Sequence, residues 1–568
     1  MKKFTISLMI CVVCSGAWAQ SLTPSQKESD FRYLASLFAT YYAPYEWKKQ
    51  LLGVDTENIA PWLKRVAAAQ TDLDFYEVCV DYVASLNDTH SHFSLPSDFV
   101  ARLPITVDVY DGKVLIETIT RSALPAADYP FAVGDELVSI DGTDIGQLLK
   151  DNAKYAAYEN PISTQRLAAT RVISRVQSLQ PHAPDVGDSA QVGIRGQDGN
   201  VNVYTIQWQK TGTPLEVGPV PSPSAASTAR SGKAAVADDD RPDYERFLDQ
   251  FTWAGVDGSE VGVLGYGVRN PIFLAGMGPT FTRRLGGAAT DFYYSGTFKY
   301  EDLMFGYIRI PNYAPTSQPQ QLQLFEQEMA FMKANTDGLI VDEMRNTGGF
   351  LCFGEDIAAR LIPYQFHATG FILRAFWTRL LGFYNALISA QAAGAPFDVI
   401  ARYETIYNAL VAANEQNRGL TGPVPLCTSS LNRDPATDAA GNIIAYQKPL
   451  MLLTDEFSVS TADSVAGMIQ DAGRGILYGM RTDGAGGNNT SYDAGPYSQG
   501  VTGMTIGLQV RKAPIVTSDY PTTPYIENVG VRPDVVNDYM TRDNLLQNGA
   551  PFVNGLLQSM AAYVRQFR

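Results

Sequence analysis

The 568-residue sequence predicts an α/β protein of several domains, and three observations support this fold class. Residues 20–100 carry apolar residues at three- and four-residue spacing, which is typical of helices. Residues 101–210 alternate apolar and polar residues between glycine turns, which is typical of strands. From residue 251 onward strand-like and helix-like segments alternate, which is typical of a mostly parallel sheet covered by helices.

The first 19 residues have the pattern of a secretory signal peptide. Lys2 and Lys3 precede an apolar run, and Ala17-Trp18-Ala19 supplies small residues for cleavage. The run is too short for a lasting membrane span, and the residues before Cys14 match a lipobox poorly. We therefore expect a soluble exported protein, periplasmic or secreted. The net charge of −15 disfavours a nucleic-acid partner.

Removal of the signal would leave Cys79, Cys352 and Cys427. An odd number without paired spacing argues against a disulfide framework and against a zinc cluster. One disulfide with a free thiol, or three buried thiols, both remain open.

The helical region is expected to contain helices over 31–42 and 62–86. The β-rich part begins with an alternating segment around the hairpin signal Asp111-Gly112. Gly134-Asp135 and Asp141-Gly142 then bracket a short apolar strand, and this pattern resembles the PDZ domain. The resemblance implies a domain over 101–210 that binds an extended peptide end, such as a C-terminus, as an added strand. A helical stretch over 146–179 would be an insertion.

A linker is expected over 211–250, because Pro219 to Asp240 is rich in Pro, Ser, Ala and Gly and then acidic. The α/β core should follow over 251–568. Its expected elements are strands at 305–310 and 338–341, a helix at 320–335, a helical and loop-rich insertion at 363–445, and a final helix at 556–567.

The turn Ser458-Val459-Ser460-Thr461 follows an apolar strand and precedes a helical pattern. A serine at such a junction lies beside free N–H groups of the helix start, where it can attack a carbonyl while the backbone holds the oxyanion. An ordinary helix N-cap is the alternative role for Ser460.

This turn resembles the tail-specific, or C-terminal-processing, serine peptidase family, in which the second serine is the nucleophile. Many members carry a lysine base where this chain has Ala485, so Lys512 is only a weak alternative base. The segment 338–349 ends in Gly348-Gly349 and resembles the family strand that supplies one oxyanion donor. The resemblance implies an oxyanion hole made by the Gly348 or Gly349 N–H and the Thr461 N–H.

Leu86-Asn-Asp-Thr89-His90 resembles the histidine segment of the tricorn-like branch of this family, and Glu527-Asn-Val-Gly-Val resembles its glutamate segment. This implies a tetrad-like site in which His90 is the base for Ser460, while Glu527 and Thr89 orient the network. It also implies a crotonase-like α/β catalytic core beside the PDZ-like domain. His92 ranks second as a base.

The sequence thus predicts an exported serine endopeptidase that acts on protein or peptide substrates by acyl transfer. This chemistry needs no metal or organic cofactor. The alternatives are a non-catalytic peptide-binding PDZ scaffold on a decayed peptidase, a peptidase with a Ser460–Lys512 dyad, and an esterase. The last is disfavoured because the Gly-x-Ser-x-Gly elbow is absent around Ser460. The sequence does not indicate an oligomeric state.

Overall fold

A computed structural model describes residues 21–216, 218, 241–256, 280–288 and 290–567. The expected signal peptide and the whole segment 219–240 lie outside these residues. Within the described residues, no helix is both long and apolar enough to cross a membrane.

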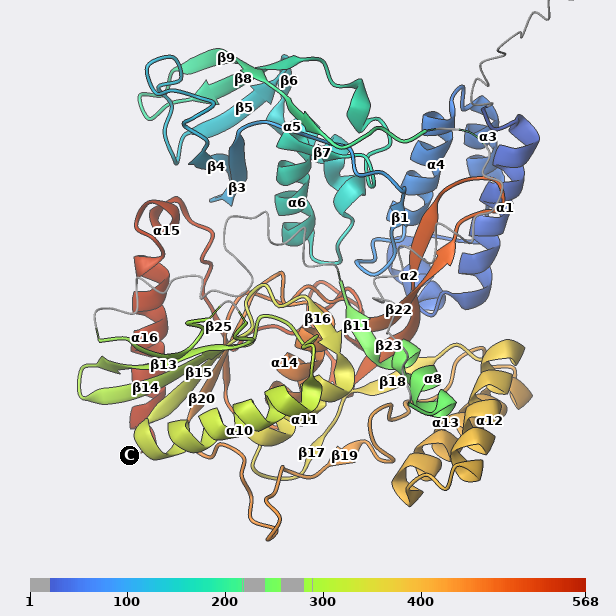
Figure 1. Ribbon diagram of the computed structural model, residues 1–568, viewed down its shortest axis with the longest axis vertical. Helices are drawn as coiled ribbons and strands as arrows, with labels where there is room; N and C mark the ends of the chain where they lie inside the picture. Colours follow the sequence, from blue (N-terminus) through green and yellow to red (C-terminus); the bar gives the residue numbers. More distant parts are fainter. Residues whose placement is uncertain (1–20, 217, 219–240, 257–279, 289, 568) are drawn as a thin grey trace, which may run out of the picture.

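The N-terminal region is a group of four helices, drawn in blue in Figure 1. They are α1 (Pro24–Tyr41), α2 (Tyr45–Leu52), α3 (Ala60–Ala68) and α4 (Asp72–Ala84). The expected continuous helix over 62–86 is in fact two helices. The Thr71 side chain accepts the N–H of Asp74 and so caps a new helix start, a local signal that overrides the apolar spacing.

The β-rich domain is built on a six-stranded sheet in the order β3-β4-β5-β8-β9, with β6 paired to β5. Helix α6 (Pro161–Ile173) packs against β3. The helical stretch expected over 146–179 ends earlier and is interrupted, because Asn160 caps α6 anew and Pro161 cannot donate to a preceding helix. The remaining elements are β3 (Ile105–Tyr110), β4 (Lys113–Ile119), β5 (Glu136–Ile140), β6 (Thr143–Asp144), α5 (Ile145–Asn152), η1 (Ala153–Ala156), η2 (Ala183–Asp185), β8 (Ser189–Arg195) and β9 (Val201–Gln207).

A three-stranded sheet, β10-β2-β7, lies beside this domain and connects its two ends. Its strands are β2 (Val100–Arg102), β7 (Ser174–Val176) and β10 (Gln209–Thr211). The expected linker over 211–250 is not wholly irregular. Helix α8 (Asp243–Thr252) occupies its end, because Tyr244, Leu248 and Phe251 bury one apolar face.

The core is a seven-stranded sheet in the order β12-β13-β14-β15-β20-β21-β25. It is parallel from β14 to β25, while β12, β13 and β14 are antiparallel. Its strands are β12 (Thr282–Leu285), β13 (Tyr294–Tyr300), β14 (Leu303–Arg309), β15 (Gly338–Asp342), β20 (Leu450–Thr454), β21 (Ile476–Gly479) and β25 (Val535–Val536).

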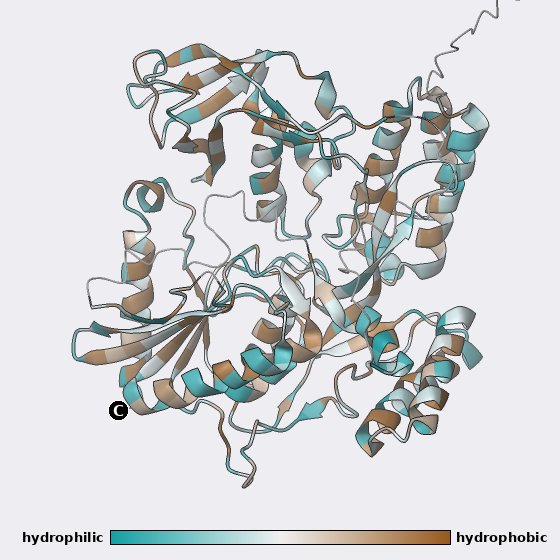
Figure 2. Cartoon of the chain, in the orientation of Figure 1, coloured by the Kyte–Doolittle hydropathy of each residue, from teal (hydrophilic) through white to brown (hydrophobic). Residues whose placement is uncertain are grey.

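Helices cover both faces of this sheet, and its central strands are largely brown in Figure 2. Leu339 and Val341 belong to one cluster with α10 (Gln318–Asn335), α11 (Leu351–Leu361) and α14 (Thr461–Asp471). Ile340 points the other way, toward α16 (Ala550–Arg565). The strand is therefore buried on both faces, as a central parallel strand must be.

A second sheet pairs a strand from the N-terminal part of the chain with strands from its C-terminal part. Strand β23 (Val501–Ile515) pairs with β1 (Phe93–Ser94), β18 (Gly370–Leu373), β22 (Gly487–Asp493) and β24 (Thr523–Tyr525). Part of the expected insertion over 363–445 is thus sheet rather than helix or loop. The rest includes the hairpin-like helices α12 (Trp377–Ala392) and α13 (Phe397–Glu415), shown in gold in Figure 1. Shorter elements complete the fold: β11 (Trp253–Gly255), β16 (Gly348–Phe350), β17 (Phe366–His367), β19 (Asn432–Arg433) and α15 (Arg542–Leu546).

Candidate active site

Ser460 lies between β20 and α14 in an unusual backbone conformation. Its φ is 65° and its ψ is −105°, a region that residues other than glycine rarely occupy. The Asp463 carboxylate accepts the Ser460 N–H at 2.5 Å. The turn is also held by Ser458, whose hydroxyl donates to the Glu343 carbonyl at 2.8 Å. A strained serine that its surroundings hold at a helix start is a common arrangement at functional sites.

His90 is the partner of Ser460. Its Nε2 lies 2.9 Å from the Ser460 Oγ, and both side chains are buried. His90 comes from the loop between α4 and β1, so the structure brings together residues that are 370 positions apart. Burial lowers the pKa of His90 to about 4. The imidazole is therefore neutral near pH 7, which is the form that accepts a proton from a hydroxyl.

The other candidate bases lie elsewhere. His92 and Lys512 are exposed, whereas Ser460 has no exposed surface. His182 is partly exposed beside Asp185, and its Nδ1 lies 2.7 Å from that carboxylate. Ala485, at the expected lysine position, is buried in a cluster with Phe457 and Val459.

Thr89 and Glu527 both reach the buried site, but they do so through different partners. The Thr89 hydroxyl donates to Asp483 at 2.6 Å and also contacts Glu159. One Glu527 carboxylate oxygen lies 2.6 Å from the Lys48 Nζ. The structure thus buries Glu527, rather than leaving it as a surface charge, but it gives the Thr89 hydroxyl other carboxylates as partners.

Sequence reasoning missed Lys48, Glu159 and Asp483. Asp483 lies in the glycine-rich loop after the Ser460 helix, and that loop was a usable signal. Glu159 precedes the Asn160-Pro161 helix start and carries no motif. Lys48 lies on α2, in a stretch without any catalytic pattern. Only the fold shows that these groups are close.

Of the residues expected to form an oxyanion hole, Gly348 lies beside Ser460, and the Gly349 carbonyl lies beside the Thr461 hydroxyl. A Cβ built on Gly348 would lie 3.0 Å from the Ser460 Cβ. The Gly348 N–H donates to the Asn346 side chain at 2.9 Å. Thr461 is the first residue of α14, so no carbonyl within the helix reaches its N–H.

The site is closed in this structure. Strand β11 pairs antiparallel with β16, and Ala254 stands opposite Gly349. The Thr461 hydroxyl donates to the carbonyls of Ala254 and Gly349, at 2.9 and 3.0 Å. Because Ser460 is fully buried, a peptide can approach it only when the segments that cover it move.

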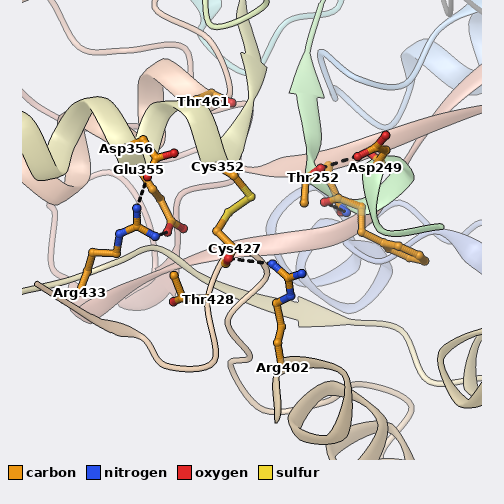
Figure 3. The surroundings of a disulfide bond; sticks show 12 residues. Asp249, Thr252, Cys352, Glu355, Asp356, Arg402, Cys427, Thr428, Arg433 and Thr461 are labelled. Carbon is orange, nitrogen blue, oxygen red and sulfur yellow. Dashed lines mark hydrogen bonds and ion pairs between the residues drawn. A yellow bond between two sulfur atoms is a disulfide. The ribbon is translucent and has the colours of Figure 1, made fainter. Parts of the chain in front are cut away.

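A disulfide bond lies directly after β16 in the chain, at the start of α11. Cys352, in the first turn of α11, is bonded to Cys427 of the expected insertion, while Cys79 is a buried free thiol. Figure 3 shows this bond with Arg402, which donates to the Cys427 carbonyl at 2.8 Å, and with Thr461 above it. A Cβ on Gly354 would lie 2.5 Å from the Thr461 Cγ2, so α11 packs directly on the start of α14. Of the two open possibilities for the cysteines, the structure shows the first.

The comparisons with known proteins agree with this architecture. Residues 304–537 match Peptidase family S41, and residues 100–216 match the PDZ domain. A protein of Chlamydia trachomatis serovar D is 25% identical over 582 residues, which is 92% of this chain and 90% of that protein. A protein of Chlamydia pneumoniae is 23% identical over 592 residues, covering 93% and 88%.

Solved structures of mature CPAF share the fold. One has a TM-score of 0.72 at 19% sequence identity and covers 96% of this chain and 98% of that one. The structure of mature CPAF complexed with lactacystin has a TM-score of 0.71 at 19% identity, covering 96% and 99%.

The matched peptidase domain identifies this chain as a serine-type peptidase. It carries a domain of peptidase family S41, the tail-specific protease family, together with a PDZ domain.

Proposed function

We propose that the protein hydrolyses peptide bonds by acyl transfer from Ser460, with His90 as the general base. The observation that supports this most directly is the 2.9 Å distance between the His90 Nε2 and the Ser460 Oγ. It lies within the range of about 2.6–3.2 Å that proton abstraction requires. The pKa of His90, lowered to about 4 by burial, keeps the base unprotonated.

In the proposed reaction His90 takes the hydroxyl proton as Ser460 Oγ bonds to the peptide carbonyl carbon. The Thr461 N–H and an N–H of Gly348 or Gly349 stabilise the oxyanion, the latter after exchange of its present partner. His90 then returns the proton to the leaving amine, and water hydrolyses the acyl-enzyme. Glu527 and Thr89 act on this pair through the buried carboxylates and Lys48.

Two finer points belong to the same proposal. The PDZ domain would hold the C-terminal end of a peptide as a strand added to an edge of its sheet, where β3 and β9 are the edge strands. The protein would be exported to the periplasm or beyond. The signal-like residues 1–19 and the Cys352–Cys427 disulfide support export, because disulfides persist in oxidising compartments.

The test compares wild type with Ser460→Ala and His90→Ala on denatured proteins and peptides. Ser464→Ala is the matched control. Ser464 is buried in α14, the helix that begins directly after Ser460, and its hydroxyl has no hydrogen-bond partner among the described residues. We expect cleavage by wild type and by the control, and a loss of about 10⁴-fold or more in kcat for the two site variants. The proposal is wrong if wild type cleaves nothing, or if Ser460→Ala cleaves as fast as wild type.

Export and peptide binding have separate tests. Cell fractionation should find the mature protein, with a new N-terminus after Ala19, outside the cytoplasm. Fluorescence anisotropy with Ser460→Ala protein should show that peptides with a free C-terminal carboxylate bind more tightly than their amides. Equal binding would exclude recognition of the C-terminus.

A further inference from the structure

Three carboxylates and one ammonium form a buried cluster beside the candidate active site. Oxygens of Asp88, Glu159 and Glu527 lie within 4.8 Å of one another. The Lys48 Nζ is 2.6 Å from Glu527 and 3.9 Å from Glu159, and it is itself buried. Buried carboxylates so close together repel each other unless a cation offsets them. The Lys48 ammonium stands where that cation is needed.

Lys48 also joins two separate segments of the site. Its Nζ donates to the Asn87 carbonyl at 2.7 Å, in the loop that carries His90. Its neighbour Trp47 donates to the carbonyl of Glu527 and to the Asn528 side chain, both at 3.1 Å. Helix α2 is therefore the common support of the histidine loop and of the glutamate turn.

Both of these segments need such support. Asn87 has a φ of 46° and Asn528 a φ of 64°, in the left-handed region. Such conformations cost free energy and persist where neighbouring groups enforce them. The Asn528 amide donates to the Asn87 carbonyl at 3.2 Å, so the two strained positions meet at the oxygen that Lys48 also binds.

The placement of the His90 ring depends on this loop. The His90 Nδ1 is buried and has no hydrogen-bond partner among the described residues, so no carboxylate bonded to that atom orients the ring. The loop itself is fixed by Asp88, which accepts the N–H of His90 at 2.9 Å and the Tyr42 hydroxyl at 2.8 Å. The contacts that fix the Asn87–His90 loop therefore also fix the position of the His90 ring.

We infer that Lys48 is a positioning residue for the peptidase site: it links Glu527 to the backbone of the His90 loop and offsets the charge of the cluster. Glu527 then influences the position of His90 through Lys48, which binds the His90 loop, and not through a contact between Glu527 and Thr89. This inference rests on the proposed function, because it assigns Lys48 to the same site.

Lys48 is also one of the charges that act on His90. Burial is the main cause of the lowered pKa of His90, and the charges that face the ring are Asp88, His92 and Lys48. Asp88 raises this pKa, whereas His92 and Lys48 lower it. Removal of the Lys48 charge should therefore raise the pKa of His90.

The principal test is Lys48→Met, with Lys49→Met as the control. Lys49 is the next residue of α2, and its exposed ammonium contacts only Asp55 and Tyr45 among the described residues, outside the cluster. We expect Lys48→Met to lower kcat by about 10²-fold, as a displaced base does, with a smaller change in KM. The acidic limb of its pH profile for kcat/KM should move to higher pH. Lys49→Met should match wild type in both. The inference is wrong if Lys48→Met has the kcat and pH profile of Lys49→Met.

A second pair of variants covers the case in which Lys48→Met does not fold. Glu527→Gln and Lys48→Met/Glu527→Gln differ only at Lys48. The double variant leaves fewer uncompensated buried charges than Lys48→Met alone, because it also removes the Glu527 carboxylate. We expect the acidic limb of the double variant at higher pH than that of Glu527→Gln. Coincident limbs would overturn the inference.

Failure of the proposed function can be told apart from failure of this inference. NMR titration of the His90 ring in Ser460→Ala protein, with and without Lys48→Met, needs no turnover. A higher His90 pKa without Lys48 supports the inference even if wild type cleaves nothing. An unchanged His90 pKa contradicts it even if wild type is an active peptidase.

Discussion

Arg166 of the PDZ domain and Glu456 of the peptidase domain form a buried ion pair. Glu456 precedes Ser460 by four residues in the chain. Arg166 also binds both oxygens of Asp108, at 2.9 and 2.6 Å, and donates to the Tyr539 hydroxyl at 2.6 Å. One guanidinium therefore fastens α6 of the PDZ domain to the loop that leads to the candidate nucleophile.

We expect Arg166→Met to destabilise the protein by roughly 3–5 kcal/mol, because it leaves buried carboxylates without their cation. Urea unfolding measures the change. Arg195→Met is the control in the same domain, since the pair of Arg195 with Glu136 is partly exposed and should contribute less than about 1 kcal/mol. Equal unfolding midpoints for the two variants would contradict this prediction.

Glu343 should make stability depend on pH. It is buried after β15, where the Tyr313 hydroxyl donates to it, and burial raises its pKa to about 8. A carboxyl whose folded pKa is raised contributes stability below its unfolded pKa, near 4.3, and that stability is lost as the pH rises toward about 8. Relative to Glu343→Gln, wild type should lose up to about 1.4 kcal/mol per pH unit between pH 5 and 8. Urea unfolding at several pH values measures this, and parallel curves would exclude it.

The Cys352–Cys427 bond closes a loop of 75 residues, so its removal should cost roughly 2–4 kcal/mol of stability. Thermal unfolding with and without a reductant measures the effect. We expect the reductant to lower the midpoint of wild type and of Cys79→Ala, but not that of Cys352→Ala/Cys427→Ala. A reductant effect in the double variant would show that another change is responsible.

Gly348→Ala should impair the site through its backbone. The φ of Gly348 is 77°, and a Cβ there would lie 2.5 Å from the Ala254 carbonyl and 3.0 Å from the Ser460 Cβ. We expect a loss of at least about 10²-fold in kcat, the effect typical of a displaced oxyanion donor. Gly394→Ala is the matched control, because its φ of 66° carries the same backbone strain but nothing lies within 4 Å of the added carbon. Equal kcat values for the two variants would contradict this prediction.

Much of the core could be predicted from the sequence, because its signals are local. The strand at 338–341 is an uninterrupted apolar run, and the structure extends it by one residue, to Asp342. The helix expected over 320–335 begins at Gln318. The expected final helix begins earlier, at Ala550, because Pro551 suits the first turn of a helix.

The candidate site was predictable only where a motif marks it. Ser460, His90 and Glu527 stand in recognisable segments, and the structure brings Ser460 and His90 within hydrogen-bond distance. Lys48 and Glu159 lie in segments that have no pattern, and they matter because of where the fold places them. Their burial is a tertiary property that no local window contains. The same holds for the pairing of Cys352 with Cys427, which depends on how the segment 363–445 folds back.

The pairing of Phe93 with Thr502, between β1 and β23, has a consequence for synthesis of the protein. His90 leaves the ribosome 370 residues before Ser460. At about 5–20 residues per second, Ser460, the proposed nucleophile, is synthesised roughly 20–75 s after His90, its proposed base. Strand β23, which anchors the His90 loop beside it, appears later still. A nascent or truncated chain that ends before β23 therefore lacks the strand that holds the His90 loop, and if His90 is the base, such a chain should be unable to cleave other proteins or itself.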